Sequence, residues 1–321
     1  MKPLTAIETK GTYATLLLPI RPDDSIDIEL LNRELDYLLQ SGVDGIYSNG
    51  TAGEFYSQSE AEFVEVNELL ASRCESAGMR FQIGASFPTP QMSLKLSKLA
   101  ASFRPGAIQV TLPDWYPPVI PEIIAFLDRV SEATAPIPLI LYNPPHAKRI
   151  VTPEEYALLC ERLPALIGVK VGGGDEHWYR RMEPLKSRLS IFVPGHTLAT
   201  GYDLGAAGSY SNVACLQPVG AKRWNDLMRS DWAAARRIEV QIQQFMTQHI
   251  LPFRDLGFSN MALDKLLSSV GNWAAIGTRL RWPYFGIDNA DLVYLRAQAR
   301  QQIPFLFESS PGSWENDARP A

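Results

Sequence analysis

The sequence predicts an α/β protein built on a (β/α)8 barrel, the TIM barrel, followed by an all-helical C-terminal extension. Eight short apolar runs alternate with longer amphipathic segments, which is the order expected of parallel strands joined by helices. No GxGxxG motif follows the first run, so an open dinucleotide-binding sheet is disfavoured. After about residue 217 only helical patterns remain, and this change predicts the extension.

The predicted strands are short and apolar, and several are flanked by glycine or proline. In chain order they are Tyr13–Pro19, Gly45–Ser48, Phe81–Ala85, Ala107–Leu112, Leu139–Tyr142, Ile167–Val171, Ile191–Pro194 and Ser209–Ala214. The helices between them are predicted from apolar residues at three- and four-residue steps, such as Leu31, Leu35 and Leu38. They cover Ile26–Gln40, Ser59–Ala77, Gln91–Phe103, Pro121–Ala133, Pro153–Arg162, Glu176–Leu185 and Thr197–Leu204.

Four further helices are predicted in the extension, at Ala221–Met228, Trp232–Gln248, Asn260–Val270 and Asp291–Gln301. We therefore expect the barrel to span residues 1–216 and the helical extension residues 217–307. Residues 308–321 are rich in Glu, Ser, Pro, Gly, Asn and Asp, a composition that predicts a poorly ordered tail.

Composition excludes several classes of protein. A length of 321 residues suits one barrel with an extension. The net charge of −5 argues against nucleic acid or an acidic membrane surface as a partner. No uninterrupted apolar run approaches the length of a spanning helix, and residues 1–10 lack a secretory signal, so a cytoplasmic location is expected. Cys74, Cys160 and Cys215 are widely spaced, which predicts reduced, mostly buried thiols.

The active site of such a barrel lies at the C-terminal ends of its strands. After the second predicted strand, residues 48–54 read Ser-Asn-Gly-Thr-Ala-Gly-Glu. Two glycines around Thr51 and Ala52 predict a tight turn whose exposed backbone N–H groups can hold a carboxylate. An ordinary glycine-rich turn between strand and helix is the alternative interpretation.

Tyr142 and Lys170 end or approach the end of two later predicted strands. A tyrosine at the last strand residue can direct its phenol into the barrel mouth and transfer protons. Lys170 lies inside an apolar strand; burial lowers the pKa of an amine, and only the neutral amine attacks a carbonyl to form an imine. The alternatives are a packing tyrosine and a lysine that extends to solvent or pairs with Asp175.

Three segments together resemble signatures of the dihydrodipicolinate synthase and N-acetylneuraminate lyase superfamily. They are residues 50–54 (GTAGE), 142–145 (YNPP) and 168–170 (GVK), and the 28-residue spacing of Tyr142 and Lys170 matches that family. A fourth stretch, residues 205–213, resembles its eighth-strand segment. The resemblance covers roughly residues 10 to 300, almost the whole chain.

The resemblance implies a role for each matching residue. Lys170 would form a Schiff base with a 2-oxo acid, and Tyr142 would relay protons and orient the bound acid. Thr51 and the backbone of Thr51 and Ala52 would hold the substrate carboxylate, and Tyr210 would border the acid. The resemblance also implies no cofactor beyond the imine with Lys170, no metal, and a homo-oligomer, either a tetramer or a dimer.

The chain also departs from the synthase pattern. Ala52 replaces the second hydroxyl residue of the turn, and Trp115 stands where the synthase has a relay tyrosine. An indole is a donor only and cannot replace a phenol in a proton relay, although Tyr116 is a possible substitute. Ala147 occupies the expected position of an arginine, and the neighbouring Lys148 lacks a planar bidentate grip. Dihydrodipicolinate synthesis is therefore disfavoured.

The lyase pattern is incomplete as well. N-acetylneuraminate lyase has an acidic pair after the seventh strand, where this chain has His196 and Thr197, so sialic acid cleavage is disfavoured. The side chains left at the mouth are aromatic or neutral and polar; the predicted substrate-binding residues are Thr51, Ala52, Trp115, His146, His196, Tyr210 and Asn212. This mixture suits a small oxo sugar acid, a hydroxyproline-derived cyclic imine or an aromatic oxo acid.

The sequence thus predicts a metal-independent, Schiff-base-dependent lyase, either an aldolase or a dehydratase or deaminase. Its expected substrate is a 2-oxo acid such as pyruvate or a 2-keto-3-deoxy sugar acid. Two alternatives remain. A metal-dependent aldolase would require His and carboxylate ligands at the strand ends, and no convincing set is found. A catalytically silent protein that binds a small metabolite is suggested by Ala52 and Trp115, whereas retention of Lys170, Tyr142 and Thr51 opposes it.

Overall fold

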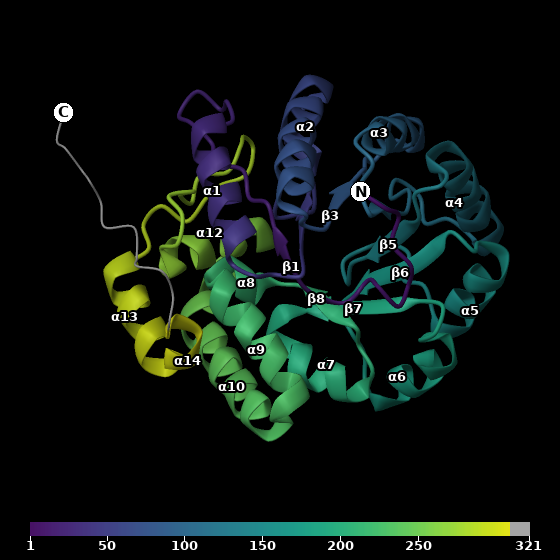
Figure 1. Cartoon of the computed structure of the whole chain (residues 1–321). Coiled ribbons are helices and arrows are strands. Elements are labelled where there is room, and N and C mark those ends of the chain that lie inside the picture. The colour runs from purple at the N-terminus through teal and green to yellow at the C-terminus, as the bar shows by residue number, and fades with distance from the viewer. Residues whose placement is uncertain (309–321) are drawn as a thin grey trace.

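The computed structural model describes residues 1–308, in which eight parallel strands form a closed barrel in the order β1 to β8 (Figure 1). The strands are β1 (Gly11–Thr15), β2 (Gly45–Ser48), β3 (Phe81–Gly84), β4 (Ala107–Thr111), β5 (Leu139–Asn143), β6 (Leu166–Val171), β7 (Ser190–Pro194) and β8 (Gly208–Tyr210). Helices connect successive strands, so the predicted (β/α)8 barrel is confirmed.

The helices around the barrel start where the sequence offers capping residues. At the start of α2, for example, the Ser59 hydroxyl accepts from the Glu62 N–H while the Glu62 carboxylate accepts from the Ser59 N–H. The elements are α1 (Ile28–Gln40), η1 (Phe55–Ser57), α2 (Glu60–Ala77), α3 (Pro90–Ser102), α4 (Ile120–Thr134), α5 (Pro153–Arg162), α6 (Glu176–Met182), η2 (Glu183–Leu185), η3 (Gly195–Thr197) and α7 (Leu198–Leu204). Each predicted barrel helix is found, with ends that differ by a few residues at most.

The C-terminal part is entirely helical, which confirms the predicted extension, and it lies together on one side of the barrel (Figure 1). Its elements are α8 (Asn212–Leu216), α9 (Pro218–Ser230), α10 (Trp232–Phe245), the π-helical turn η4 (Met246–Ile250), α11 (Leu251–Asp255), α12 (Asn260–Gly271), α13 (Leu292–Gln302) and α14 (Pro304–Phe307). Helix α12 packs against α8, the short helix that directly follows the last strand, β8. Apart from Glu308, the predicted tail at residues 308–321 lies outside the described residues.

Two predicted strands are too long. The first ends at Thr15 rather than Pro19, because the Leu17 N–H leaves the sheet and donates to the Glu34 side chain at 2.7 Å. The last ends at Tyr210, and the apolar run that follows forms α8 instead of a strand. The Ser211 hydroxyl accepts from the Ala214 N–H at 3.0 Å and thereby begins a helix. Periodicity alone does not separate a short buried helix from a strand.

Aromatic side chains fill the interior of the barrel. Tyr13, Tyr47, Phe192 and Tyr210 belong to one buried cluster, and the Tyr47 and Tyr210 ring centroids are 4.6 Å apart. In register, Tyr142 pairs with Lys170, and Lys170 pairs with Phe192 on the next strand. Paired residues of neighbouring parallel strands direct their side chains to the same side of the sheet. The fold therefore brings Tyr142 and Lys170 together beside this aromatic interior.

The predicted state of the cysteines is confirmed, since Cys74, Cys160 and Cys215 are free and buried. Within residues 1–308, no helix is both long enough and apolar enough to cross a membrane.

Candidate active site

Lys170, near the end of β6, has its amine among three tyrosine rings. Its Nζ atom is 4.1 Å from the ring centroid of Tyr142, 4.9 Å from that of Tyr47 and 5.0 Å from that of Tyr210. The same atom donates a hydrogen bond to the Tyr47 Oη at 3.2 Å. The electron-rich faces of these rings attract a cation, so they partly replace the water that the amine has lost.

The charge state of this amine depends on its burial. Desolvation lowers the pKa of Lys170 to about 8, and the opposing attraction to Asp264 is weaker. A substantial fraction of the amine is therefore neutral slightly above pH 7, as nucleophilic attack on a carbonyl requires.

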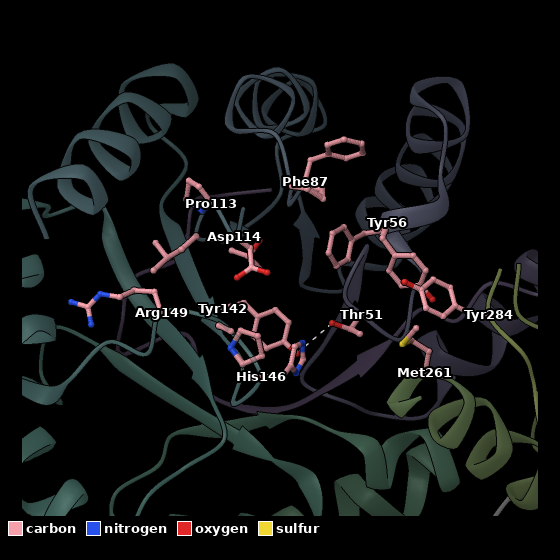
Figure 2. Close-up of a pocket in the computed structure, with 16 residues that line it drawn as sticks. Thr51, Tyr56, Phe87, Pro113, Asp114, Tyr142, His146, Arg149, Met261 and Tyr284 are labelled. Carbon is pink, nitrogen blue, oxygen red and sulfur yellow. Dashed lines mark hydrogen bonds between the residues drawn. The ribbon is translucent and has the colours of Figure 1, made fainter. Parts of the chain in front are cut away.

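Thr51 and Tyr142 form a hydroxyl pair next to the amine. The Thr51 Oγ1 lies 3.3 Å from the Tyr142 Oη, and Figure 2 shows this contact. Burial raises the pKa of Tyr142, while the hydrogen bond from Thr51 acts in the opposite direction. At neutral pH the phenol therefore carries its proton. The three predicted catalytic residues, Lys170, Tyr142 and Thr51, are thus brought together.

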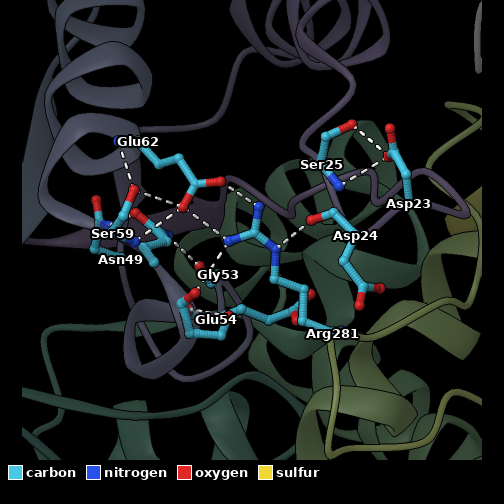
Figure 3. A network of polar contacts seen from close by, with 11 residues as sticks. Asp23, Asp24, Ser25, Asn49, Gly53, Glu54, Ser59, Glu62 and Arg281 are labelled. Carbon is cyan, nitrogen blue, oxygen red and sulfur yellow. Dashed lines mark hydrogen bonds and ion pairs between the residues drawn. The ribbon is translucent and has the colours of Figure 1, made fainter.

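The turn that carries Thr51 is held from behind by buried charges. Glu54 has a left-handed backbone, with φ of 51°, and its carboxylate accepts from the Lys265 Nζ at 2.5 Å and from the Arg281 N–H at 3.1 Å. Figure 3 shows the Arg281 guanidinium between Glu62 and the Asp24 backbone. Because both partners of Glu54 belong to the C-terminal part of the chain, that part fixes the position of the turn.

A cavity of about 400 Å³ opens around Lys170. Seven of its lining residues were predicted from the sequence as catalytic or substrate-binding: Thr51, Ala52, Tyr142, Lys170, His196, Tyr210 and Asn212. The sequence did not indicate five other residues of the same wall: Tyr47, Cys215, Arg254, Asn260 and Asp264.

A second cavity, of about 270 Å³, shares Thr51 and Tyr142 with the first. Its wall is largely aromatic and apolar, with Phe55, Tyr56, Phe87, Met261 and Tyr284 (Figure 2). Its polar lining residues include Asp114, His146 and Arg149. The two cavities meet at the Thr51–Tyr142 pair, so a bound molecule that reaches Lys170 has two directions in which to extend.

The sequence profile of the dihydrodipicolinate synthetase family matches residues 8–266. The chain belongs to this family. A curated relative, an N-acetylneuraminate lyase from Rhizobium meliloti (strain 1021), is 29% identical over 300 residues, which are 90% of this chain and 94% of the relative. A 4-hydroxy-tetrahydrodipicolinate synthase from Methanothermobacter thermautotrophicus is 25% identical over 250 residues, covering 75% of this chain and 87% of the relative.

Solved structures agree on the fold of this family member. YagE, a prophage protein of the dihydrodipicolinic acid synthase family from E. coli K12 in complex with pyruvate, superimposes with a TM-score of 0.80 at 18% identity, covering 92% of this chain and 98% of YagE. A catalytic lysine mutant of the sialic acid aldolase from Ruminococcus gnavus has a TM-score of 0.81 at 18% identity, covering 95% of this chain and 98% of that one. At these identities the likeness establishes the fold.

His196 in this family member has a defined tautomer. The His196 backbone N–H donates to the Asn212 Oδ1 at 3.1 Å, which leaves the Asn212 amide nitrogen facing the His196 Nδ1 at 2.9 Å. The Nδ1 atom therefore accepts, and the proton of the neutral ring lies on Nε2. Burial lowers the pKa of His196, so the ring is a neutral hydrogen-bond donor at pH 7.

Two predicted substrate-binding residues lie away from Lys170. His146 lines the second cavity and not the first. Trp115 lines neither cavity: its side chain is 89% exposed, and its carbonyl accepts from the Lys148 Nζ at 3.2 Å. A role for Trp115 in binding stays a prediction. Arg149 also lines the second cavity, but its guanidinium forms an ion pair with Glu155.

Proposed function

We propose that this protein is a Schiff-base-dependent lyase that acts on a 2-oxo acid. The observation that carries the proposal is the half-buried amine of Lys170, with a pKa of about 8, on the wall of a cavity of about 400 Å³. An amine in this setting is suited to capture a carbonyl group. The names of the relatives, a lyase and a synthase, and the pyruvate bound to YagE agree with this chemistry.

The residues divide the work as follows. The neutral amine of Lys170 attacks C2 of the oxo acid, and loss of water from the carbinolamine leaves an iminium. A carbon–carbon or carbon–oxygen bond next to the iminium breaks or forms, and its electrons move toward or away from the nitrogen. Tyr142, hydrogen bonded to Thr51, transfers the proton, while the turn at Thr51 and Ala52 holds the substrate carboxylate. The mechanism uses neither a metal nor a separate cofactor.

We propose that neither activity named for the two curated relatives is the main one. Ala147 and the His196–Thr197 pair lack the charged groups expected for those two substrates. Among the remaining classes, the aromatic wall of the second cavity favours a substrate with an aromatic or apolar distal part. The test is condensation of pyruvate with aryl aldehydes and, separately, with polyhydroxy aldehydes, with the products measured by chromatography. Faster condensation with the polyhydroxy aldehydes would refute the proposed aromatic or apolar preference.

Borohydride reduction in the presence of pyruvate, followed by peptide mass spectrometry, tests the function itself. We expect a reduced adduct on the Lys170 peptide, and none in Lys170→Ala. Lys148→Ala, which removes an amine outside the Lys170 cavity, is the matched control and should retain the adduct. If pyruvate and longer 2-oxo acids all fail to give an adduct, the Schiff-base mechanism is wrong and the silent metabolite binder replaces it.

A further inference from the structure

We propose that Asp264, on helix α12 of the C-terminal extension, is the acid–base partner of Lys170 in imine formation. The proposal rests on the function proposed above and adds a residue that the sequence did not indicate. Asp264 and Lys170 line the same cavity. The supporting observations are the surroundings of the carboxylate, its relation to the amine, and the state of the other ionisable groups nearby.

Asp264 lines the Lys170 cavity together with Asn260, Leu263 and Leu267 of the same helix. Among residues 1–308, no hydrogen bond or ion pair to the Asp264 carboxylate is found. The adjacent Lys265 does not pair with it, because the Lys265 amine is bound to Glu54. Asp264 is half-buried, so its carboxylate is reached from the cavity and is free to exchange a proton with a group bound there.

Lys170 and Asp264 influence each other electrostatically. Burial raises the pKa of Asp264 to about 7, and the positive charge of Lys170 opposes this rise. Burial lowers the pKa of Lys170 to about 8, and the negative charge of Asp264 opposes that fall. The two pKa values are thereby brought toward each other, so moving a proton from the ammonium to the carboxylate costs far less than it does between the free groups in water.

The other ionisable groups near Asp264 do not compete for this role. Helix α12 packs against α8, α11, α13 and η4, and the cavity wall adds β2, β5, β8 and η3. The groups concerned are Cys215 (α8), Arg254 and Asp255 (α11), Arg296 and Arg300 (α13), His249 (η4), Tyr47 (β2), Tyr142 (β5), Tyr210 (β8) and His196 (η3). Burial raises the pKa of Cys215, Tyr47, Tyr142 and Tyr210 and lowers the pKa of His196, so these five are neutral at pH 7.

The remaining groups are engaged or distant from the cavity. Arg254 lines the cavity, with its side chain 55% exposed and its guanidinium 3.6 Å from the Asp255 carboxylate. Arg296 donates to the Ser269 carbonyl, and His249 contacts Gln302. Among the described residues of the cavity wall, Lys170 and Asp264 are the amine and the carboxyl group whose pKa values burial moves toward neutrality from opposite sides.

The step balances as follows. The Lys170 ammonium gives one proton to the Asp264 carboxylate, which leaves a neutral amine and a neutral carboxylic acid. The amine adds to C2, and one N–H proton moves to the carbonyl oxygen to give the carbinolamine. Asp264 then protonates this hydroxyl, which leaves as water, and the iminium faces a carboxylate again. Because no direct ion pair joins the two side chains in the described structure, a solvent molecule carries the proton between them.

The test is the pH dependence of imine formation with pyruvate, measured by rapid-quench borohydride trapping in wild type and Asp264→Asn. Loss of the negative charge lowers the pKa of Lys170 further, so the midpoint of the pH profile should move to lower pH by up to about one unit. The plateau rate should nevertheless fall about 100-fold, because the proton acceptor and donor is gone. Asp128→Asn, the same change at an exposed site on α4, should alter neither value.

Each other outcome counts against the proposal. If the midpoint of the pH profile falls but the plateau rate is unchanged, Asp264 acts only as a nearby charge and transfers no proton. If neither the midpoint nor the plateau rate changes, Asp264 has no part in the mechanism. Asp264→Glu, which keeps the carboxyl group, carries the test if the asparagine variant does not fold: a wild-type midpoint with less than about a tenfold loss of rate is expected, and a 100-fold loss overturns the proposal. Failure of wild type to form any adduct would instead refute the proposed function.

Discussion

At the scale of single residues, Lys170 places a reactive amine where the fold would prefer an apolar side chain. The folded protein binds the Lys170 proton less tightly than the unfolded chain, because burial lowers its pKa to about 8. This destabilisation is fully present below pH 8 and disappears as the pH rises through the unfolded pKa of about 10.4. The proposed activity and the stability of the fold therefore make opposite demands on this position.

Replacing Lys170 should make the protein more stable while abolishing the adduct. We expect Lys170→Met to raise the free energy of unfolding at pH 7 by roughly 2 kcal/mol, with a smaller gain at pH 10. Urea unfolding at the two pH values measures the difference. A loss of stability at pH 7 would contradict the idea that the amine carries a desolvation cost.

Tyr142 should matter for proton transfer more than for capture of the oxo acid. In Tyr142→Phe the ring that borders Lys170 remains, but the hydroxyl bound to Thr51 is lost. We expect exchange of the pyruvate methyl protons with D₂O, followed by NMR, to slow about 100-fold. Borohydride trapping should fall less. Tyr294→Phe, at an exposed tyrosine of α13, is the matched control, and an equal loss in both variants would refute the assignment.

At the scale of elements, the turn after β2 depends on helix α12. The Glu54–Lys265 pair is fully buried, and breaking it from one side leaves a charge without its partner. Lys265→Met should lower the free energy of unfolding by about 3–5 kcal/mol. Glu54→Gln combined with Lys265→Met should recover part of this loss in a denaturation series. Additive losses in the double variant would show that the two side chains do not stabilise each other.

Sequence periodicity was sufficient for the barrel but not for every boundary. The runs that became β2 to β7 carry clear apolar patterns, and their strands lie within a residue or so of the predicted ranges. The ends of β1 and β8 escaped prediction because they depend on side chains, Glu34 and Ser211, that bind backbone N–H groups. Such competition between local hydrogen bonds and the sheet leaves no periodic signal.

The same limit applies to the candidate site. Strand-end motifs led to the prediction of Lys170, Tyr142 and Thr51, since each lies next to a recognisable turn, and the fold brings the three together. Asp264 belongs to a helix distant in sequence from these motifs, and only tertiary packing brings it to the Lys170 cavity. In the sequence, Asp264 appears only as an acidic residue next to Leu263 and near Leu266. Without the fold, this pattern cannot be told from that of a residue on a solvated helix face.

At the scale of the whole molecule, the extension is part of the barrel site. Leu263, Asp264 and Leu267 of α12 complete the cavity around Lys170. The predicted division into residues 1–216 and 217–307 therefore should not give two independent units. We expect a chain cut after residue 216 to lack cooperative thermal unfolding and to form no adduct with pyruvate. A soluble, cooperative fragment that traps pyruvate would show that the barrel is autonomous.

Exposed aromatic residues support the expected assembly into a homo-oligomer. Trp115, Tyr116, Trp282 and Phe285 are each at least 79% exposed, and large aromatic side chains of this kind are enriched where subunits meet. We expect sedimentation equilibrium to give a dimer or tetramer, and Trp282→Ser or Trp115→Ser to shift it toward smaller species. A monomer at all concentrations would refute the assembly.

The cage of Tyr47, Tyr142 and Tyr210 around Lys170 also gives the protein an intrinsic optical reporter. Conversion of the amine into an iminium changes the field that these fixed rings experience, so their near-ultraviolet circular dichroism should respond to each turnover. Substrate screening then needs neither a label nor a coupled assay, and a silent ligand is distinguished from a covalent one by whether borohydride makes the spectral change permanent.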